Sequence, residues 1–307
     1  MTNMLDIEIT TRIRSRSDVN YRILQLLGSG GNSVVYLALA LNGKFRGVLF
    51  ALKLFTRLSD QERLDKFQQE AEFLRKCDHP SIMRVYDDGV YEEGKGKHTG
   101  RFPFVIAEFL PLTIHDLIGQ KITTAEKISF TLQLLSALSF LDEHVPAVVH
   151  RDIKPKNIFV KGKSCVLGDF GLMKFLDKDV KVDRQTYKES VLPGMPFLYR
   201  TPDLVAYAKN QADISTKSDV YQLGLVVAEI FTGKNPQIKA NDFLAQVRLD
   251  GIAYIAGRHS VIICEFIETM LESNPENRPS AADLIDRWEG VFRDVVDQCH
   301  QLEGRVF

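Results

Sequence analysis

The stretch HRDIKPKN at residues 150–157, followed by DFG at residues 169–171, decides the fold of this chain. Eight specified positions followed by three more at a short distance rarely arise by chance. Asp152 is suited to orient a hydroxyl group and to accept its proton. Asn157 and Asp169 offer the hard oxygen ligands that Mg²⁺ prefers. The spacing therefore predicts two neighbouring loops that orient a hydroxyl group and bind divalent cations.

These two motifs resemble the catalytic loop and the metal-binding loop of the eukaryotic-type protein kinase family. Lys154, two residues after Asp152, is the form typical of Ser/Thr kinases. The resemblance implies that Asp152 positions the acceptor hydroxyl and that Lys154 neutralises charge on the transferred group. It implies that Asn157 and Asp169 bind Mg²⁺, with Mn²⁺ as an alternative. It also implies an α+β fold of two lobes, a small antiparallel β lobe with one key helix and a larger α-rich lobe.

The hydrophobic periodicity divides the chain in the same way. The first third alternates as strands and turns around one amphipathic helix at 60–77. Beyond Pro111 apolar helical patterns dominate, and the first of them opens with Thr123 and Glu126 at capping-box spacing. We therefore expect an N-terminal extension at 1–20, a small β-rich lobe at 21–107, a hinge at 108–111 and a large helical lobe at 112–303.

A glycine-rich turn, GSGGNSVV at 28–35, lies between two predicted strands and resembles the phosphate-binding loop of the family. Ser33 stands where the family pattern has its third glycine. Lys53 ends a later strand, and by the resemblance it binds the α- and β-phosphates and needs a carboxylate to hold it. Glu70 shares the apolar face of the following helix, whereas Glu72 points about 160° away. We therefore predict an ion pair between Lys53 and Glu70.

The resemblance extends the nucleotide site to the segment FVIAEFLP at 104–111. It implies that the backbone of Glu108 and Leu110 hydrogen-bonds the adenine edge and that Phe159 forms the adenine floor. The predicted cofactors are ATP and Mg²⁺. The predicted ATP-binding residues are Gly28, Ser29, Gly30, Gly31, Ser33, Val35, Ala51, Lys53, Glu70, Glu108, Leu110 and Phe159.

Arg151 lies beside the predicted catalytic aspartate as a cation without an evident partner. In the family this arrangement goes with a phosphorylated activation loop, because a phosphate satisfies the arginine. The corresponding loop here is 172–195, part of a polar stretch at 172–198 that we expect to be irregular, and it contains Thr186, Tyr187 and Ser190. Our hypothesis is that Thr186 or Ser190 is an autophosphorylation site, which calls for self-association of the chain.

Two later motifs extend the resemblance to about residues 20–290. YRTPD at 199–203 resembles the end of the activation segment, and NPENRP at 274–279 resembles a late arginine motif. In the family, the acidic residue of the first motif pairs with the arginine of the second. The resemblance therefore implies an ion pair between Asp203 and Arg278.

Pro196 departs from the family pattern, since Ser/Thr kinases usually have at this place a threonine that bonds the catalytic Asp and Lys. The departure concerns the surface that receives the substrate and removes no catalytic group. We expect a Ser/Thr protein kinase. A pseudokinase that acts as a scaffold and a small-molecule kinase of related fold remain as alternatives.

Composition excludes several other classes. A net charge of −1 over 307 residues argues against a nucleic-acid-binding surface and against a polybasic membrane anchor. The four cysteines lack the paired spacing of zinc sites, which favours a reducing compartment. No stretch reaches the roughly 18 apolar residues that span a bilayer. Asp6 and Glu8 interrupt any signal-peptide core. We therefore expect a cytoplasmic protein whose partners are ATP and a protein substrate, without nucleic acid or a membrane segment.

Overall fold

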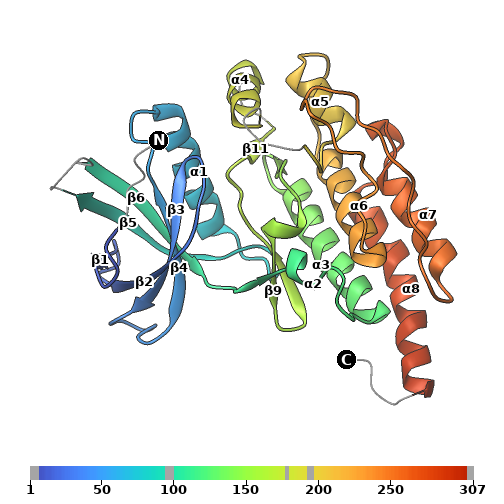
Figure 1. Ribbon diagram of the computed structural model, residues 1–307, viewed down its shortest axis with the longest axis horizontal. Helices are drawn as coiled ribbons and strands as arrows, with labels where there is room; N and C mark the ends of the chain where they lie inside the picture. The colour runs from blue at the N-terminus through green and yellow to red at the C-terminus, as the bar shows by residue number, and fades with distance from the viewer. Residues whose placement is uncertain (1–6, 94–99, 177–179, 192–196, 303–307) are drawn as a thin grey trace. The chain divides into compact units, whose positions relative to one another are not determined.

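The structure is a computed structural model that describes residues 7–93, 100–176, 180–191 and 197–302. The side chains of 180–182 and 299–302 are outside this description. The chain divides into two compact units, Met1–Leu110 and Pro111–Phe307. The first unit is built on an antiparallel sheet and the second on helices (Figure 1). The predicted α+β fold with a small β lobe and a larger α-rich lobe is confirmed.

The first unit contains a six-stranded sheet in the order β1-β2-β3-β4-β6-β5, in which all neighbours are antiparallel. The N-terminal extension supplies a strand, because Ile13 of β1 lies opposite Tyr21 of β2. The strands are β1 (Arg12–Arg14), β2 (Asn20–Ser29), β3 (Ser33–Ala40), β4 (Leu49–Phe55), β5 (Val85–Glu93) and β6 (Gly100–Glu108).

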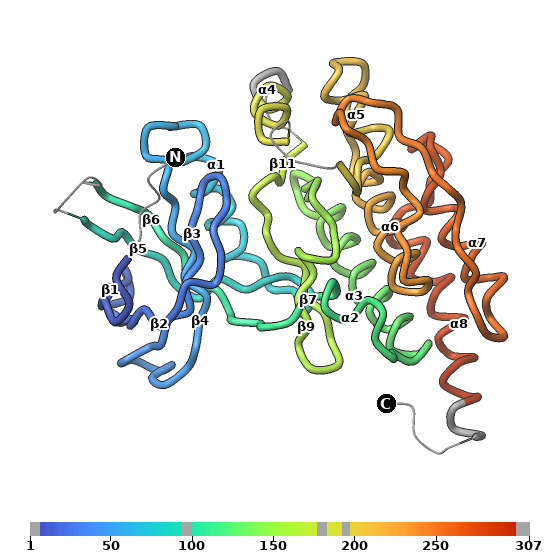
Figure 2. The backbone as a smooth tube through the Cα atoms, in the orientation of Figure 1, coloured from blue at the N-terminus to red at the C-terminus, as the bar shows by residue number. Residues whose placement is uncertain are grey.

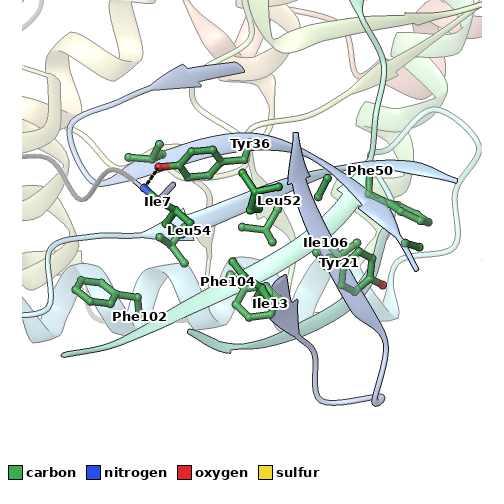
Figure 3. Packing of buried hydrophobic residues seen from close by; sticks show 14 residues of the cluster. Ile7, Ile13, Tyr21, Tyr36, Phe50, Leu52, Leu54, Phe102, Phe104 and Ile106 are labelled. Atoms are coloured by element: carbon green, nitrogen blue, oxygen red, sulfur yellow. Dashed lines mark hydrogen bonds between the residues drawn. The ribbon is translucent and has the colours of Figure 1, made fainter. Parts of the chain in front are cut away.

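One face of this sheet forms the core of the first unit. Tyr36, Leu52 and Ile106 lie opposite one another on three adjacent strands, and all three are buried. The N-terminal extension closes this core, since Ile7 is buried and its backbone N–H donates to Tyr36 Oη at 2.9 Å (Figure 3). The N-terminal extension covers this face of the sheet, and the opposite face makes other contacts.

Helix α1 (Gln61–Lys76) is the one long helix among the described residues of the first unit. It begins at Asp60, whose side chain accepts a hydrogen bond from the backbone N–H of Arg63 at 3.1 Å. Its apolar face packs on the sheet, because the rings of Phe67 and Phe55 lie 5.4 Å apart. The helix predicted at 60–77 is confirmed.

The second unit is organised around three long helices, whose backbones run through it in Figure 2: α3 (Thr124–Glu143), α6 (Lys217–Thr232) and α8 (Ala281–Leu302). Trp288 of α8 is fully buried against Phe231 and Phe266. The capping box predicted at the start of α3 is present, since Thr123 and Glu126 bond each other's backbone N–H groups. In the ranges described, no helix combines the length and the apolarity that a membrane crossing needs. The elements are β7 (Leu112–Thr113), α2 (Ile114–Leu117), α3 (Thr124–Glu143), β8 (Val148–Val149), β9 (Ile158–Lys161), β10 (Ser164–Leu167), β11 (Lys174–Phe175), α4 (Val180–Val191), α5 (Pro202–Ala208), α6 (Lys217–Thr232), α7 (Ser260–Met270) and α8 (Ala281–Leu302), with short 3₁₀ turns at Pro155–Asn157 and Pro275–Asn277.

Helix α4 corrects a sequence prediction. We expected irregular structure over 172–198, but Val180–Val191 is helical. The helix is held by tertiary packing, because Tyr187 is buried in a cluster with Tyr207 and Phe243. Polar composition misled the prediction, since a helix needs only one buried face to be stabilised by its neighbours.

Candidate active site

A buried carboxylate fixes the backbone of the catalytic loop. Asp219 of α6 accepts hydrogen bonds from the backbone N–H groups of His150 at 2.7 Å and Arg151 at 2.9 Å. Burial raises the pKa of Asp219 to about 7, against the lowering effect of these two bonds. Arg151 has a left-handed φ of 67°, a strained conformation that such bonds help to maintain. The loop is therefore held in one shape before any substrate arrives.

The three polar residues predicted from the catalytic loop contact one another. Lys154 Nζ lies 2.9 and 2.8 Å from the two carboxylate oxygens of Asp152. Asn157 Nδ2 donates to Asp152 Oδ2 and to the Asp152 carbonyl oxygen, both at 2.8 Å. Burial raises the pKa of Asp152, while Lys154 acts in the opposite direction. Because the amide nitrogen of Asn157 is committed, its Oδ1 is the atom left to face a cation.

The DFG loop lies against the catalytic loop. Gly168 N–H donates to the Asn157 carbonyl at 2.9 Å, and the Gly168 carbonyl lies 3.1 Å from His150 Nε2. The rings of His150 and Phe170 pack edge-to-face with centroids 4.4 Å apart, and both residues are fully buried. The two rings thus pack the DFG loop against the catalytic loop. Burial lowers the pKa of His150 to about 4, so the imidazole is neutral near pH 7.

The donor set of these two loops fits a magnesium site. Asp169 is exposed and has a left-handed φ of 56°, a conformation that is uncommon outside glycine and that recurs at functional sites. Its carboxylate and Asn157 Oδ1 are hard oxygen ligands. Mg²⁺ typically takes few ligands from a protein and completes its octahedron with phosphate and water oxygens.

The glycine-rich turn connects β2 to β3. Gly28 lies opposite Val35 in the strand pairing, and the turn closes with a 2.8 Å hydrogen bond from Gly30 N–H to the Ser33 carbonyl. In the part of the chain that the structure describes, a Cβ added at Gly28 or Gly31 meets no atom within 4 Å, and neither φ is positive. Neither packing nor backbone conformation requires glycine at these two positions.

The face of the sheet opposite the core carries the next group of predicted residues. Lys53 lies across from Val35, and Ala51 precedes Lys53 by two residues on the same side. Lys53 Nζ donates to Glu70 Oε1 at 2.8 Å and to Oε2 at 3.2 Å. Glu70 is buried, whereas Glu72 is exposed and pairs with Lys76. The choice of Glu70 over Glu72 agrees with this geometry.

Three further residues were predicted to contact the nucleotide, Glu108, Leu110 and Phe159. Glu108 ends β6 opposite Phe50 of β4, and its backbone N–H donates to the Arg84 carbonyl at 3.3 Å. Leu110 is the last residue of the first unit. Phe159 lies on β9 of the second unit, half-buried and paired with Thr113 and Val166.

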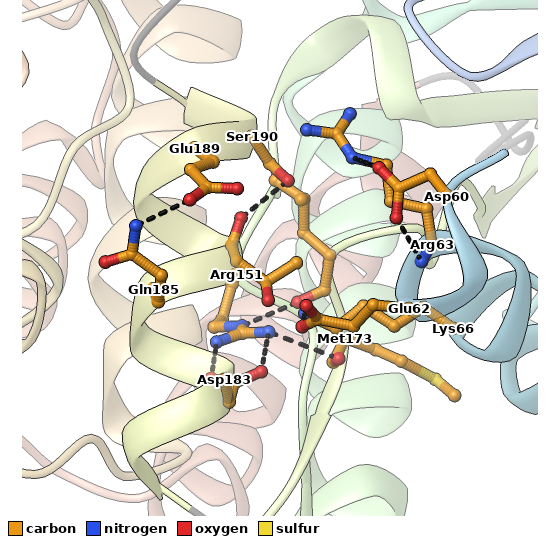
Figure 4. A network of polar contacts seen from close by, with 12 residues as sticks. Asp60, Glu62, Arg63, Lys66, Arg151, Met173, Asp183, Gln185, Glu189 and Ser190 are labelled. Carbon is orange, nitrogen blue, oxygen red and sulfur yellow. Dashed lines mark hydrogen bonds and ion pairs between the residues drawn. The ribbon is translucent and has the colours of Figure 1, made fainter. Parts of the chain in front are cut away.

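Arg151 is already neutralised, contrary to the sequence prediction. Its guanidinium donates to the Asp183 carboxylate at 2.6 and 3.1 Å (Figure 4). It also donates to the Leu172 carbonyl at 2.5 Å. Asp183 belongs to α4 and also accepts a hydrogen bond from Tyr207 Oη at 2.6 Å. The Tyr187 ring lies 4.6 Å from the guanidinium carbon. An aspartate therefore occupies the place that we assigned to a phosphate. We did not predict this pairing, because we did not expect the helix that presents Asp183.

The predicted modification sites lie on the same helix. Thr186 is 3% exposed and Tyr187 is 2% exposed, so neither presents its hydroxyl to solvent in this conformation. Ser190 is half-buried and its hydroxyl donates to the Thr186 carbonyl at 2.8 Å. Pro196, at which the chain departs from the family pattern, lies outside the described residues.

The predicted pair between the two later motifs is present. Arg278 Nη2 lies 3.2 Å from Asp203 Oδ1, and both side chains are almost completely buried. Arg278 also donates to the carbonyls of Glu272 and Lys217 and stacks on Tyr221. This buried ion pair connects α5 to the segment that precedes α8 within the second unit.

Sequence reasoning missed Gln222. Its Oε1 accepts a hydrogen bond from the Ile153 N–H at 3.0 Å, and its Nε2 donates to the Tyr199 carbonyl at 2.8 Å. One amide thus ties the catalytic loop to the segment that follows residue 196. A signal was available, because Gln222 lies three positions after Asp219, on the same side of a helix that is mostly apolar from Val220 onward.

Comparisons with known proteins agree with this geometry. The family model described as protein kinase domain matches residues 21–288. Serine/threonine-protein kinase PknB of Mycolicibacterium smegmatis is 29% identical over 90% of this chain and 44% of its own length. Serine/threonine-protein kinase PrkC of Bacillus subtilis is 29% identical over 73% of this chain and 32% of its own length. Human serine/threonine-protein kinase 10 is 27% identical over 87% and 26%, respectively. The chain thus spans less than half the length of these curated relatives.

Proposed function

The chain belongs to the protein kinase family, and from this premise we propose that it transfers the γ-phosphoryl group of ATP to Ser or Thr hydroxyls of a protein substrate. The observation that carries the proposal is the set of contacts at Asp152, where one lysine and one asparagine hold a half-buried carboxylate. The similarity to three serine/threonine-protein kinases supports the same reaction.

The residues of the second unit have distinct tasks in this proposal. Asp152 accepts a hydrogen bond from the acceptor hydroxyl and aligns it, since catalysis of this kind depends mainly on positioning. Lys154 holds the carboxylate and neutralises charge that develops on the transferred group. Asn157 and Asp169 would hold Mg²⁺, which supplies charge neutralisation at the phosphates when bound.

The first unit supplies the nucleotide contacts. We assign Lys53 to the α- and β-phosphates, and Glu70 to holding its ammonium group in place. The glycine-rich turn would approach the phosphates through its backbone N–H groups. The hinge backbone at Glu108 and Leu110 would meet the adenine edge. Autophosphorylation in a self-associated form remains part of the proposal, and of the two predicted acceptors Ser190 is the less buried.

The test is phosphoryl transfer from labelled ATP. The chain is incubated with Mg²⁺ and a library of peptides that each carry one Ser, Thr or Tyr. We expect label on Ser and Thr peptides. Turnover with small alcohols but with no peptide would indicate a small-molecule kinase. Binding of ATP without transfer to any acceptor would indicate a scaffold.

Removal of the carboxylate that holds Lys53 should lower kcat/KM, whereas removal of an exposed carboxylate on the same helix should not. We expect Glu70→Gln to lower kcat/KM about ten- to a hundredfold, because a buried hydrogen bond between charged groups is worth about 1.5–3 kcal/mol. The matched control is Glu72→Gln on the same helix, which breaks the exposed pair with Lys76. Steady-state kinetics at varied ATP measures both. Equal effects of the two variants would contradict the assigned role of Glu70.

A further inference from the structure

The N-terminal extension connects two strands that lie far apart in the sheet of the first unit. Its strand β1 pairs with β2, and before β1 the Thr10 N–H donates to the Ile23 carbonyl of β2 at 2.9 Å. After β1, the Arg16 N–H donates to the Asp88 carbonyl of β5 at 2.7 Å. In the strand order, β3, β4 and β6 separate β2 from β5, which ends the sheet. The extension therefore links β2 to the opposite edge strand.

The extension is packed closely against β5. Ser15 Oγ donates to Asp87 Oδ2 at 2.5 Å, and both residues are buried. Gly89 of the same strand has no positive φ, yet a Cβ at this position would lie 3.1 Å from Ser15 Cα and closer still to the Phe104 ring. The missing side chain of Gly89 thus lets the ring and the extension approach β5. The extension is therefore a packed part of the first unit.

The Asp88 carboxylate joins the extension to helix α1. Arg16 Nη2 lies 2.9 Å from Asp88 Oδ2. Arg75, in the last turn of α1, pairs with the other oxygen, Oδ1. The Asp88 side chain is only 16% exposed, so this carboxylate is largely shielded from solvent. Charges that are shielded and shared in a network interact more strongly than isolated surface pairs. Asp88 is therefore an anchor on β5 for both arginines.

Both ends of α1 are held by polar contacts, and Glu70 lies between them. In the first turn, Arg63 Nη1 donates to Asn32 Oδ1 of the glycine-rich turn at 2.6 Å. In the last turn, Arg75 holds the helix to β5. Apolar burial holds α1 to the sheet without directional preference, whereas the polar contacts at its ends are directional. Because a helix of a few turns moves as a rigid element, a shift of its last turn changes the distance between Glu70 and Lys53.

We propose that Asp88 is a positioning residue for the ion pair between Lys53 and Glu70. The N-terminal extension supports Asp88 through Arg16. Asp88 acts through Arg75 and α1, not on the nucleotide itself. The inference rests on the proposed function, because it adds a support to the ion pair that we assign to the α- and β-phosphates. It gives the extension a task in catalysis, although the extension supplies none of the predicted nucleotide contacts.

Two adjacent basic residues at the end of α1 provide the test. Arg75→Gln removes the pair with Asp88, whereas Lys76→Gln removes the exposed pair with Glu72 on the same helix. Both variants lose one positive charge from the last turn, so their effects on the helix dipole are matched. We expect Arg75→Gln to lower kcat/KM for ATP about three- to tenfold with a Ser peptide as acceptor, and Lys76→Gln to leave it unchanged. Equal effects of the two variants would overturn the inference.

A second pair of variants tests the contribution of the extension. Arg16→Gln removes the other arginine from Asp88 and should lower kcat/KM for ATP about two- to fivefold. The control is Asp18→Asn, which breaks the exposed pair with Arg14 within the extension. Asparagine suits this position, because Asp18 has a left-handed φ of 62°. Activity of Arg16→Gln equal to that of Asp18→Asn would overturn the role of the extension.

A double variant separates positioning from a merely structural role. In a Glu70→Gln background, Arg75→Gln should cause little further loss of kcat/KM, because positioning acts through Glu70. A structural role would give the same fold-loss in both backgrounds, and that result would refute positioning. Arg75→Lys keeps a charged donor for Asp88 and should recover most of the activity that Arg75→Gln loses. Thermal unfolding checks that each variant folds.

Hydrogen exchange separates this inference from the proposed function. The exchange of the α1 amides is measured by mass spectrometry on the full chain without nucleotide. We expect faster exchange in Arg75→Gln than in Lys76→Gln, because the last turn of α1 loses its anchor. This result together with no transfer by the wild-type chain would refute the proposed function and keep the support of α1 by Asp88. Transfer by the wild type, with equal exchange and equal kinetics of the two variants, would keep the function and overturn the inference.

Discussion

Replacement of Asp152 by asparagine is expected to lower kcat for phosphoryl transfer about 10²- to 10⁴-fold, which is the usual contribution of a positioned acid or base. Asparagine retains one oxygen, which in the place of Oδ2 can still accept the bonds from Lys154 and Asn157. The substitution therefore removes the charge and the proton-accepting capacity while it preserves the local packing. Rates of transfer to a Ser peptide at saturating ATP measure the effect.

The matched control is Asp250→Asn, which breaks the exposed ion pair with Lys234. We expect this variant to retain wild-type activity, because surface pairs contribute little. ATP binding by Asp152→Asn should also persist, since Asp152 is assigned to the acceptor hydroxyl. Activity within a few fold of wild type for Asp152→Asn would show that the loop geometry serves another reaction.

Local sequence patterns predicted the parts of the site that depend on nearby residues. Helical phase alone distinguished Glu70 from Glu72, because residues two positions apart on an α-helix point about 160° away from each other. Capping-box spacing placed the start of α3 at Thr123 and Glu126. Each of these predictions depends on a few consecutive turns, in which the sequence itself determines which side chains share a face.

Long-range contacts were beyond the reach of these patterns. The partner of Arg151 is Asp183, 32 residues away, on a helix that exists because Tyr187 packs against Tyr207. Propensity is a weak guide to such a helix, since tertiary contacts decide its stability. Sequence identifies cations, and only the structure shows which of them are already neutralised.

The buried pair between Arg278 and Asp203 gives the largest expected effect on stability. We expect Arg278→Met to lower the free energy of unfolding by about 3–5 kcal/mol, because it leaves the Asp203 charge buried without its partner. Asp203 Oδ2 already lacks a partner in the described residues, so no second donor compensates. The single tryptophan, Trp288, lies in the same unit and is fully buried. Its fluorescence during urea unfolding therefore reports on the unit that carries the substitution.

Lys234→Met is the matched control, since its ion pair with Asp250 is more than 60% exposed on both sides. It should cost less than about 1 kcal/mol. The double variant Arg278→Met with Asp203→Leu tests the cause, because it removes both charges together. If the loss came from packing alone, the double variant would be less stable than the wild type by about the sum of the two single effects. If it comes from the isolated carboxylate, the double variant should recover part of the stability that Arg278→Met loses.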